Sequence, residues 1–259
     1  MPEPNTQKLE ARRSIVTWVD ILGYKNLLSA GDYETAYRAS RIMSKFETEE
    51  FEGFGSKVAA HRQTFAVSDA IIRVVDADGF ASKGAVFYEL FDMAINQLNT
   101  VMNGVVVSGG MALGDVCLGT DEHPTPMGIP VGVAYQLDES RWEPSICVDS
   151  QILSAVIHDQ SLRYNPIEEE LSYTFSWIFS HEGYFFVNYL AAAAQDEGEL
   201  LNALETHRAL IVGNLADMSL PSQVQKKYHF LRDYHNAFLN WVLSEDDGSA
   251  MGAAFAFAD

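Results

Sequence analysis

Cysteine and positive charge are both scarce in this chain of 259 residues. The two cysteines, Cys117 and Cys147, cannot form a disulfide framework and match no metal-ligand spacing, so we expect buried thiols in a reducing compartment. Seventeen Lys and Arg stand against 36 Asp and Glu, which gives a formal charge of −19. Such a charge repels polyanions, so neither nucleic acid nor an anionic membrane surface is an expected partner.

Long apolar runs are also missing. The first 13 residues are polar and lack the apolar stretch of a cleavable signal. The uncharged run 93–114 contains asparagines, a glutamine and four glycines, which hydrocarbon would penalise. We therefore expect a cytoplasmic protein without a membrane span, and the 47% hydrophobic content is enough for a folded core.

The pattern of apolar residues predicts an α+β fold. Alternation or β-branched character favours strands, whereas spacings of three and four favour helices. The first half then has the order β-α-β-β-α-β, the ferredoxin-like arrangement with both helices on one face of an antiparallel sheet. The expected segments are strand 14–19, helix 32–50, strands 57–66 and 70–75, helix 87–101 and strand 105–116, then helix 128–141, strand 145–148 and strands near 172–179 and 183–190.

The predicted helices and strands divide the chain into four parts: an arm 1–13, a main domain 14–190, a C-terminal helical pair 191–243 and a tail 244–259. The helices are expected over 197–218 and 222–243, with a break at Pro221. Apolar residues and a histidine in the last helix alternate steps of four and three, as in a coiled-coil seam. That seam fits either a dimer contact or packing on the protein's own sheet.

Two aspartates end apolar segments in places where they could meet. Asp20 follows a buried strand in W-V-D-I-L-G-Y, and Asp69 lies at the hairpin junction in F-A-V-S-D-A-I-I. Alone, Asp20 fits a turn residue that accepts backbone hydrogen bonds. The predicted strand order places the two at one sheet end, where bare carboxylates about 4 Å apart repel by roughly 4 kcal/mol at an effective dielectric of 20. Such a pair requires a proton or a hard cation such as Mg²⁺ or Mn²⁺.

Four ordered motifs carry a family resemblance. They are D-I-L-G-Y at 20–24, S-D-A-I at 68–71, S-G-G-M-A-L-G-D-V at 108–116 and V-G-V-A-Y-Q-L-D-E at 131–139. Over about residues 14–190 the sequence resembles the class III nucleotidyl cyclases, and among them the bacterial pyrimidine cyclases of the Pycsar antiphage defence type. The helical C-terminal segment is similar to an extension carried by the bacterial branch.

The resemblance implies a metal-dependent enzyme that converts UTP, or alternatively CTP, into a 3′,5′-cyclic monophosphate and pyrophosphate as an antiviral second messenger. It also implies a homodimer with composite active sites and two Mn²⁺ or Mg²⁺ ions per site. Asp20, Asp69 and the carbonyl of Ile21 would be the metal ligands. The turn of Leu22, Gly23 and Tyr24 would hold phosphate.

Departures from the family concern the base and the transition state. Phe65 stands where adenylate cyclases have a base-reading Lys and guanylate cyclases a Glu; it fits a stacking platform for the base or a core residue. Thr125 falls at a second base-reading position or is an ordinary turn threonine. Gly132 and Gln136 replace the family's Asn and Arg, and Ser108 stands where many members carry Arg.

Several arginines are candidates for the missing cation. Arg141 lies just beyond Gln136, and Arg62 and Arg73 lie on the hairpin, although each also fits a surface ion pair. Gln136 and Arg141 are thus the catalytic candidates. The losses at 132 and 136 also keep open a degenerate cyclase-fold module that binds nucleotide without turnover.

Overall fold

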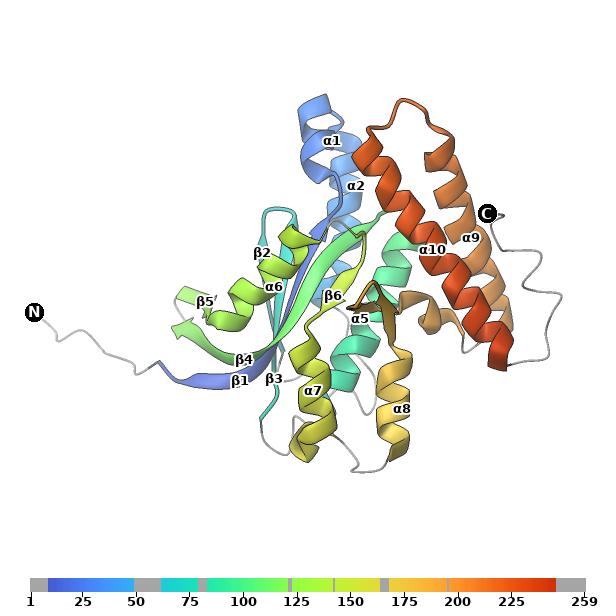
Figure 1. The fold of residues 1–259 in the computed structure, drawn as a ribbon. Helices are drawn as coiled ribbons and strands as arrows, with labels where there is room; N and C mark the ends of the chain where they lie inside the picture. Colours follow the sequence, from blue (N-terminus) through green and yellow to red (C-terminus); the bar gives the residue numbers. More distant parts are fainter. Residues whose placement is uncertain are drawn as a thin grey trace, which may run out of the picture.

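A computed structural model describes residues 9–48, 62–78, 83–120, 123–141, 143–163, 168–194 and 196–245, and its elements are shown in Figure 1. The strands are β1 Ala11–Ile21, β2 Arg62–Val67, β3 Ala70–Asp76, β4 Val107–Thr120, β5 His123–Met127, β6 Ile146–Val148, β7 Ile178–His181 and β8 Tyr184–Val187. The helices are α1 Tyr24–Ala30, α2 Tyr33–Met43, α3 Lys45–Thr48, α5 Ala85–Met102, α6 Ile129–Ser140, α7 Ser150–His158, α8 Glu168–Ser176, α9 Glu197–Ala216 and α10 Ser222–Glu245, with 3-10 turns η2 Gln160–Leu162 and η3 Tyr189–Ala193.

The strands form one sheet in the order β2-β3-β1-β4-β6-β8-β7, and β5 pairs with β4. The first four positions are antiparallel neighbours, which confirms the predicted ferredoxin-like core. β1 is central in that core, since it pairs along its length with both β3 and β4. β6 then joins β4 in parallel and extends the sheet beyond the core.

One face of the sheet is covered by α2 and α5, as Figure 1 shows for α5, and carries the main hydrophobic core. Ile15 and Val19 of β1 pack there together with Leu90 and Met93 of α5. Asp32 caps α2 by accepting a hydrogen bond from the Thr35 amide at 3.1 Å, as the sequence pattern predicts. Both predicted helices therefore lie on the same side.

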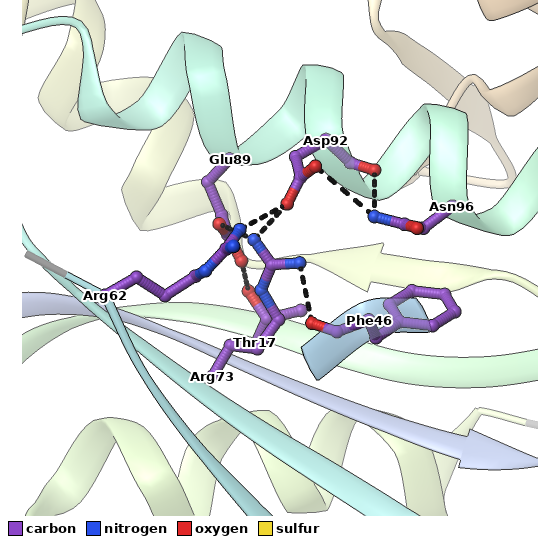
Figure 2. A network of polar contacts seen from close by, with 7 residues as sticks. All are labelled: Thr17, Phe46, Arg62, Arg73, Glu89, Asp92 and Asn96. Atoms are coloured by element: carbon purple, nitrogen blue, oxygen red, sulfur yellow. Dashed lines mark hydrogen bonds and ion pairs between the residues drawn. The ribbon is translucent and has the colours of Figure 1, made fainter. Parts of the chain in front are cut away.

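A buried ionic network ties α5 to this face (Figure 2). Arg73 of β3 is 1% exposed and bonds both Glu89, at 2.8 Å, and Asp92. Arg62 reaches Asp92 at 2.7 Å, and Thr17 of β1 donates to Glu89 at 2.8 Å. Because each charge has an opposite partner, the network holds the hairpin and α5 in register, and removing one partner would leave a buried charge uncompensated.

The opposite face is crossed by α6, which packs over β4 and β1 (Figure 1). Close approach there requires glycine. A Cβ on Gly110 would lie 2.1 Å from the Ala134 carbonyl oxygen, and one on Gly114 would lie 2.9 Å from Pro130 Cγ. The glycines of the third motif are therefore sites of close packing, as expected from the sequence.

The region after β6 departs from expectation. The strand expected at 172–179 is mostly α8, and only its end belongs to β7; α7 was not anticipated. Leu171 and Phe175 are four residues apart and both pack on the core, so helical spacing prevails over the aromatic and β-branched character of the segment. Predictions for 1–8, 49–50, 57–61 and 246–259 lie outside the described residues.

The C-terminal helices share the main core. Buried residues of α9 and α10, among them Leu204, Ile211, Leu231 and Phe238, belong to the same hydrophobic cluster as the sheet and α5. The a/d seam of α10 is thus largely occupied within the chain. Of the two interpretations left open by the pattern, intramolecular packing is the one observed.

The uncharged run 93–114 forms the second half of α5, a turn and the start of β4. None of the described helices is long and apolar enough to cross a membrane. Cys147 is buried and Cys117 is half-buried, and both are free thiols. Burial raises the pKa of Cys147 to about 12, which leaves it unreactive at neutral pH.

Candidate functional site

Asp20 and Asp69 meet at one end of the sheet. Asp20 is the penultimate residue of β1 and pairs with Ala70 of β3, and Asp69 immediately precedes Ala70 in the hairpin turn. Ser68 before it has φ 60°, a left-handed backbone that sharpens the turn. The two side chains are close enough for a hydrogen bond between them. The structure therefore brings together the two aspartates that the sequence singles out.

The electrostatics of Asp20 reflect this crowding. Burial, followed by the carboxylates of Asp69 and Asp138, raises the pKa of Asp20 to about 7. A hydrogen bond of 2.8 Å from the Ile21 amide to Asp20 Oδ1 opposes the rise only in part. At neutral pH the Asp20 carboxyl is therefore only about half ionised, and binding of a proton or a cation relieves the repulsion within the cluster.

Asp138 is a third carboxylate at this site, and the sequence analysis did not assign it. It lies on α6 four residues after Ala134 and eight after Pro130, both buried against the sheet, so it is on the sheet-facing side of the helix. It hydrogen-bonds Ser108, the residue that pairs with Asp20 across β1 and β4. Burial raises the pKa of Asp138, whereas Ser108 and the charge of Lys227 lower it. The helical phase of the fourth motif was the signal that could have found this residue.

Lys227 of α10 is the second residue that sequence reasoning missed. Its ammonium interacts with Asp138, Asp20 and Glu143. Burial lowers the pKa of Lys227, and these three carboxylates act against that shift. A basic side chain delivered by the C-terminal helix thus partly balances the carboxylates at the end of the sheet.

The donor set suits a hard divalent cation. Within the described ranges no group of three or more His, Cys, Asp or Glu side chains is arranged to hold a metal ion. Asp20 and Asp69 remain as a pair of oxygen ligands with mutual repulsion to relieve. Mg²⁺ is commonly held by one or two carboxylates together with substrate phosphates, so a two-carboxylate site fits such an ion.

The turn after β1 is only partly available to a phosphate. The Leu22 amide donates to the Val106 carbonyl at 3.0 Å, so it is already bonded. Gly23 has φ 79° and nothing within 4 Å of where a Cβ would be, which leaves its surroundings open. The Tyr24 hydroxyl accepts a hydrogen bond from Ser40 at 3.1 Å, so its side chain ties α1 to α2.

Thr125 lies far from the aspartates of the same chain, whereas Phe65 lies on β2 only two residue pairs along the sheet from the Asp20–Ala70 pair. Phe65 pairs with Ile72 on β3 and packs, half-buried, against the small cluster beneath α6. Thr125 is exposed on β5, beside the β4 segment from Leu118 to Thr120. Leu118 is ten residues beyond Ser108 on β4, roughly 33 Å at the rise of a strand. The predicted cation ligands and Thr125 therefore lie at opposite ends of the sheet, with Phe65 on the aspartate side.

A cavity of about 270 Å³ lies at the Thr125 end. Arg12, Gln63 and Asp76 contribute polar groups to its lining, and Leu118 and Gly119 contribute part of its wall. Arg12 pairs with Asp76 at 3.4 Å. A space with amide, guanidinium and carboxylate groups on a partly apolar wall is suited to a small polar ring.

The candidate catalytic cations are engaged elsewhere. The Arg141 guanidinium lies 3.8 Å from the centroid of the Tyr184 ring, and Arg62 and Arg73 belong to the buried network on the other face of the sheet. The expectation that Arg73 is a surface ion pair is therefore wrong, because α5 covers it completely. Gln136 is exposed on α6.

Comparison with known proteins gives similarities in structure alone. No family model and no curated protein sequence matches the chain. Among solved structures, the guanylyl cyclase Cya2 is 14% identical with a TM-score of 0.41, over 57% of this chain and 79% of that one. A class III adenylyl cyclase-like ATP-binding protein from Pseudomonas aeruginosa is 13% identical with a TM-score of 0.40, over 80% of this chain and 45% of that one. At these values neither similarity decides what the chain does.

Proposed function

We propose that the chain is a divalent-cation-dependent nucleotidyl cyclase that acts on a pyrimidine nucleoside triphosphate, with UTP favoured, and serves as an antiviral second-messenger synthase. The observation that carries the proposal is the Asp20–Asp69 pair, in which burial and the neighbouring carboxylate together raise the pKa of Asp20 to about 7. The four ordered sequence motifs give the reaction class. CTP is the alternative substrate.

In the reaction the ribose 3′-oxygen forms a bond to the α-phosphorus, the α–β anhydride bond breaks, pyrophosphate leaves and the 3′-hydroxyl proton is lost. Two divalent cations bound there would activate the 3′-oxygen and neutralise charge on the α-phosphate. Asp20 and Asp69 would hold the cations, together with the Ile21 carbonyl. The Leu22 amide already donates to the Val106 carbonyl, so the amides of Gly23 and Tyr24 would donate hydrogen bonds to the phosphate.

A homodimer would complete the site. Twofold symmetry that places two copies face to face brings the carboxylate end of one sheet over the cavity end of the other. Exposed apolar side chains lie at both ends of this sheet: Val67, at 49%, beside the hairpin turn, and Met127 at 43% and Ile129 at 83% where β5 leads into α6. The partner copy would then supply Thr125 and the cavity that includes Gln63, while Phe65 lies on the aspartate side.

The decisive experiment incubates purified protein with Mn²⁺ and each of the four nucleoside triphosphates. Pyrophosphate release and a cyclic product with UTP support the proposal, and a preference for CTP selects the alternative substrate. A protein that turns over none of the four is not a cyclase under these conditions, and the proposal fails.

A second candidate is a nucleotide-binding module without turnover. Gly132 and Gln136 lack the chemistry of the family's Asn and Arg, and the Arg141 guanidinium lies against Tyr184. This candidate predicts that UTP and Mn²⁺ raise the melting temperature while no pyrophosphate appears. Formation of any cyclic product excludes it.

A further inference from the structure

Lys227 occupies a position in α10 where an apolar residue would be expected. It lies three and four residues before Phe230 and Leu231, which are 3% and 0% exposed, so it shares their inward face of the helix. Its neighbour Lys226 is exposed. Lysine is seldom placed on a buried helix face unless its charge has partners.

The partners are carboxylates. Lys227 interacts with Asp138, Asp20 and Glu143, and Asp20 in turn contacts Asp69. Glu143 is 3% exposed, and among the described residues its Oε2 has no hydrogen-bond partner. The charge of one ammonium thus acts on several carboxylates, one of which has an unsatisfied buried oxygen. The cluster is short of positive charge even with Lys227 in place.

Buried polar contacts fix the helix that carries Lys227. Tyr234 lies two turns further along α10; its hydroxyl donates to Asn188 Oδ1 at 2.8 Å and accepts from the Leu190 amide at 2.8 Å. The buried rings of His207 and His235 join α9 to α10 with Nδ1 atoms 2.9 Å apart. These contacts set the depth at which Lys227 enters the site.

We propose that Lys227 is a positioning residue of the carboxylate site, where its ammonium balances Asp138 and Asp20 in the cation-free protein and competes with a divalent cation for them. The C-terminal helical pair is then part of the site, and cation binding is linked to the position of α10. This inference rests on the proposed binding of a cation by Asp20 and Asp69, but not on turnover.

The test measures Mn²⁺ binding by calorimetry, and by the Mn²⁺-induced change in melting temperature, on protein first freed of metal. Lys227→Met removes the charge and keeps the side-chain length; Lys227→Arg keeps the charge; Lys226→Met is the matched control on the exposed face. We expect Lys227→Met to bind Mn²⁺ about tenfold more tightly, because one competing charge near the carboxylates is gone. Lys227→Arg and Lys226→Met should stay within about twofold of the unmodified chain.

Lys227→Gln replaces Lys227→Met if the latter does not fold. In a cyclase assay Lys227→Met should lower the Mn²⁺ concentration that gives half the maximal rate. Unchanged Mn²⁺ affinity in the folded variant, an equal gain in Lys226→Met, or no Mn²⁺ binding by the unmodified chain overturns the inference. Mn²⁺ binding that depends on Lys227 as expected, without cyclisation of any triphosphate, refutes the proposed function alone.

Discussion

Burial and two neighbouring carboxylates act on Asp20 in the same direction. In the unfolded chain this carboxyl ionises near pH 4, whereas in the folded chain its pKa is about 7. Between these values the folded state keeps a proton that the unfolded state has lost. The contribution of the Asp20 carboxyl to the free energy of unfolding is therefore greatest at low pH and is lost as the pH rises through 7.

Asp20→Asn should remove this pH dependence in metal-free protein. At pH 8 we expect the variant to be more stable than the unmodified chain by about 1 to 2 kcal/mol, since water screens part of the repulsion on a half-buried group. At pH 4 the ionisation of Asp20 should make little difference between the free energies of unfolding of the two proteins. Thermal unfolding with EDTA at both pH values measures the effect, and a variant that melts lower at pH 8 contradicts it.

Catalytic activity should fall when either aspartate is removed, whereas removal of the Asp20 charge should raise stability at pH 8. Asp20→Ala and Asp69→Ala each remove an anionic cation ligand and should lower cyclase activity by about a thousandfold or more. Circular dichroism should show both variants folded, and the exposed Asp233→Ala on α10 serves as a control. Unchanged turnover in either variant would show that the assignment of the ligands is wrong.

Phe65 is the residue predicted to stack on the nucleotide base. Phe65→Ala should reduce use of the pyrimidine triphosphate by about 1 to 3 kcal/mol in kcat/KM through lost stacking, without creating activity on ATP or GTP. Phe65 is half-buried against the cluster under α6, so a stability cost is also expected. Kinetics with UTP, CTP and ATP beside melting temperatures separate the effects. A stability loss with unchanged nucleotide preference would leave Phe65 as a packing residue.

The seating of α6 on β4 depends on backbone contact, because Gly110 lies directly under the Ala134 carbonyl. Gly110→Ala should push the helix away and destabilise the protein by about 1 to 3 kcal/mol, and should also move Asp138 relative to Asp20. Gly132→Ala on the same helix is the matched control. A Cβ there meets nothing within 4 Å, so it should stabilise by about 0.5 to 1 kcal/mol. Equal unfolding midpoints for the two variants would refute this account of the contact.

The main core runs from the sheet into the C-terminal helices without interruption. Tyr189 and Leu190 of η3 are 0% exposed beneath α9 and α10, and Phe230 of α10 stacks edge-on against Phe186 of β8. The helical pair is therefore a covering layer of the core. Its removal would expose apolar surface on η3, β8 and α5 together.

A chain ending at residue 194 should consequently fail to fold cooperatively. Each large apolar side chain that is uncovered costs about 1.5 to 3 kcal/mol, and several such losses exceed the usual stability of a domain. Thermal unfolding and hydrogen exchange of the shortened chain check this. A sharp melting transition close to that of the full chain would mean that 14–190 is self-sufficient.

Much of the architecture was predictable because local patterns carry it. Runs of β-branched and apolar residues gave β1 and β3, spacings of three and four gave α2, α5 and α10, and the split βαβ order then implies that β1 is central. That topology was enough to place Asp20 beside Asp69. The strand prediction for 172–179 was wrong because the aromatic residues of this segment fit a strand or a helix equally. Only the core residues that they contact decide between the two structures.

The amino-acid sequence by itself determined three things: the strand order of the core, the negative net charge of the chain, and the position of two aspartates at one end of the sheet. Tertiary structure alone decided the rest of the site. Asp138 and Lys227 are distant from Asp20 along the chain, and each is an ordinary charged residue in its own helix. They reach one carboxylate cluster only because α6 is seated on two glycines and α10 is fixed by buried tyrosine and histidine contacts. Local periodicity specifies which face of a helix is buried, but not which neighbour that face will meet.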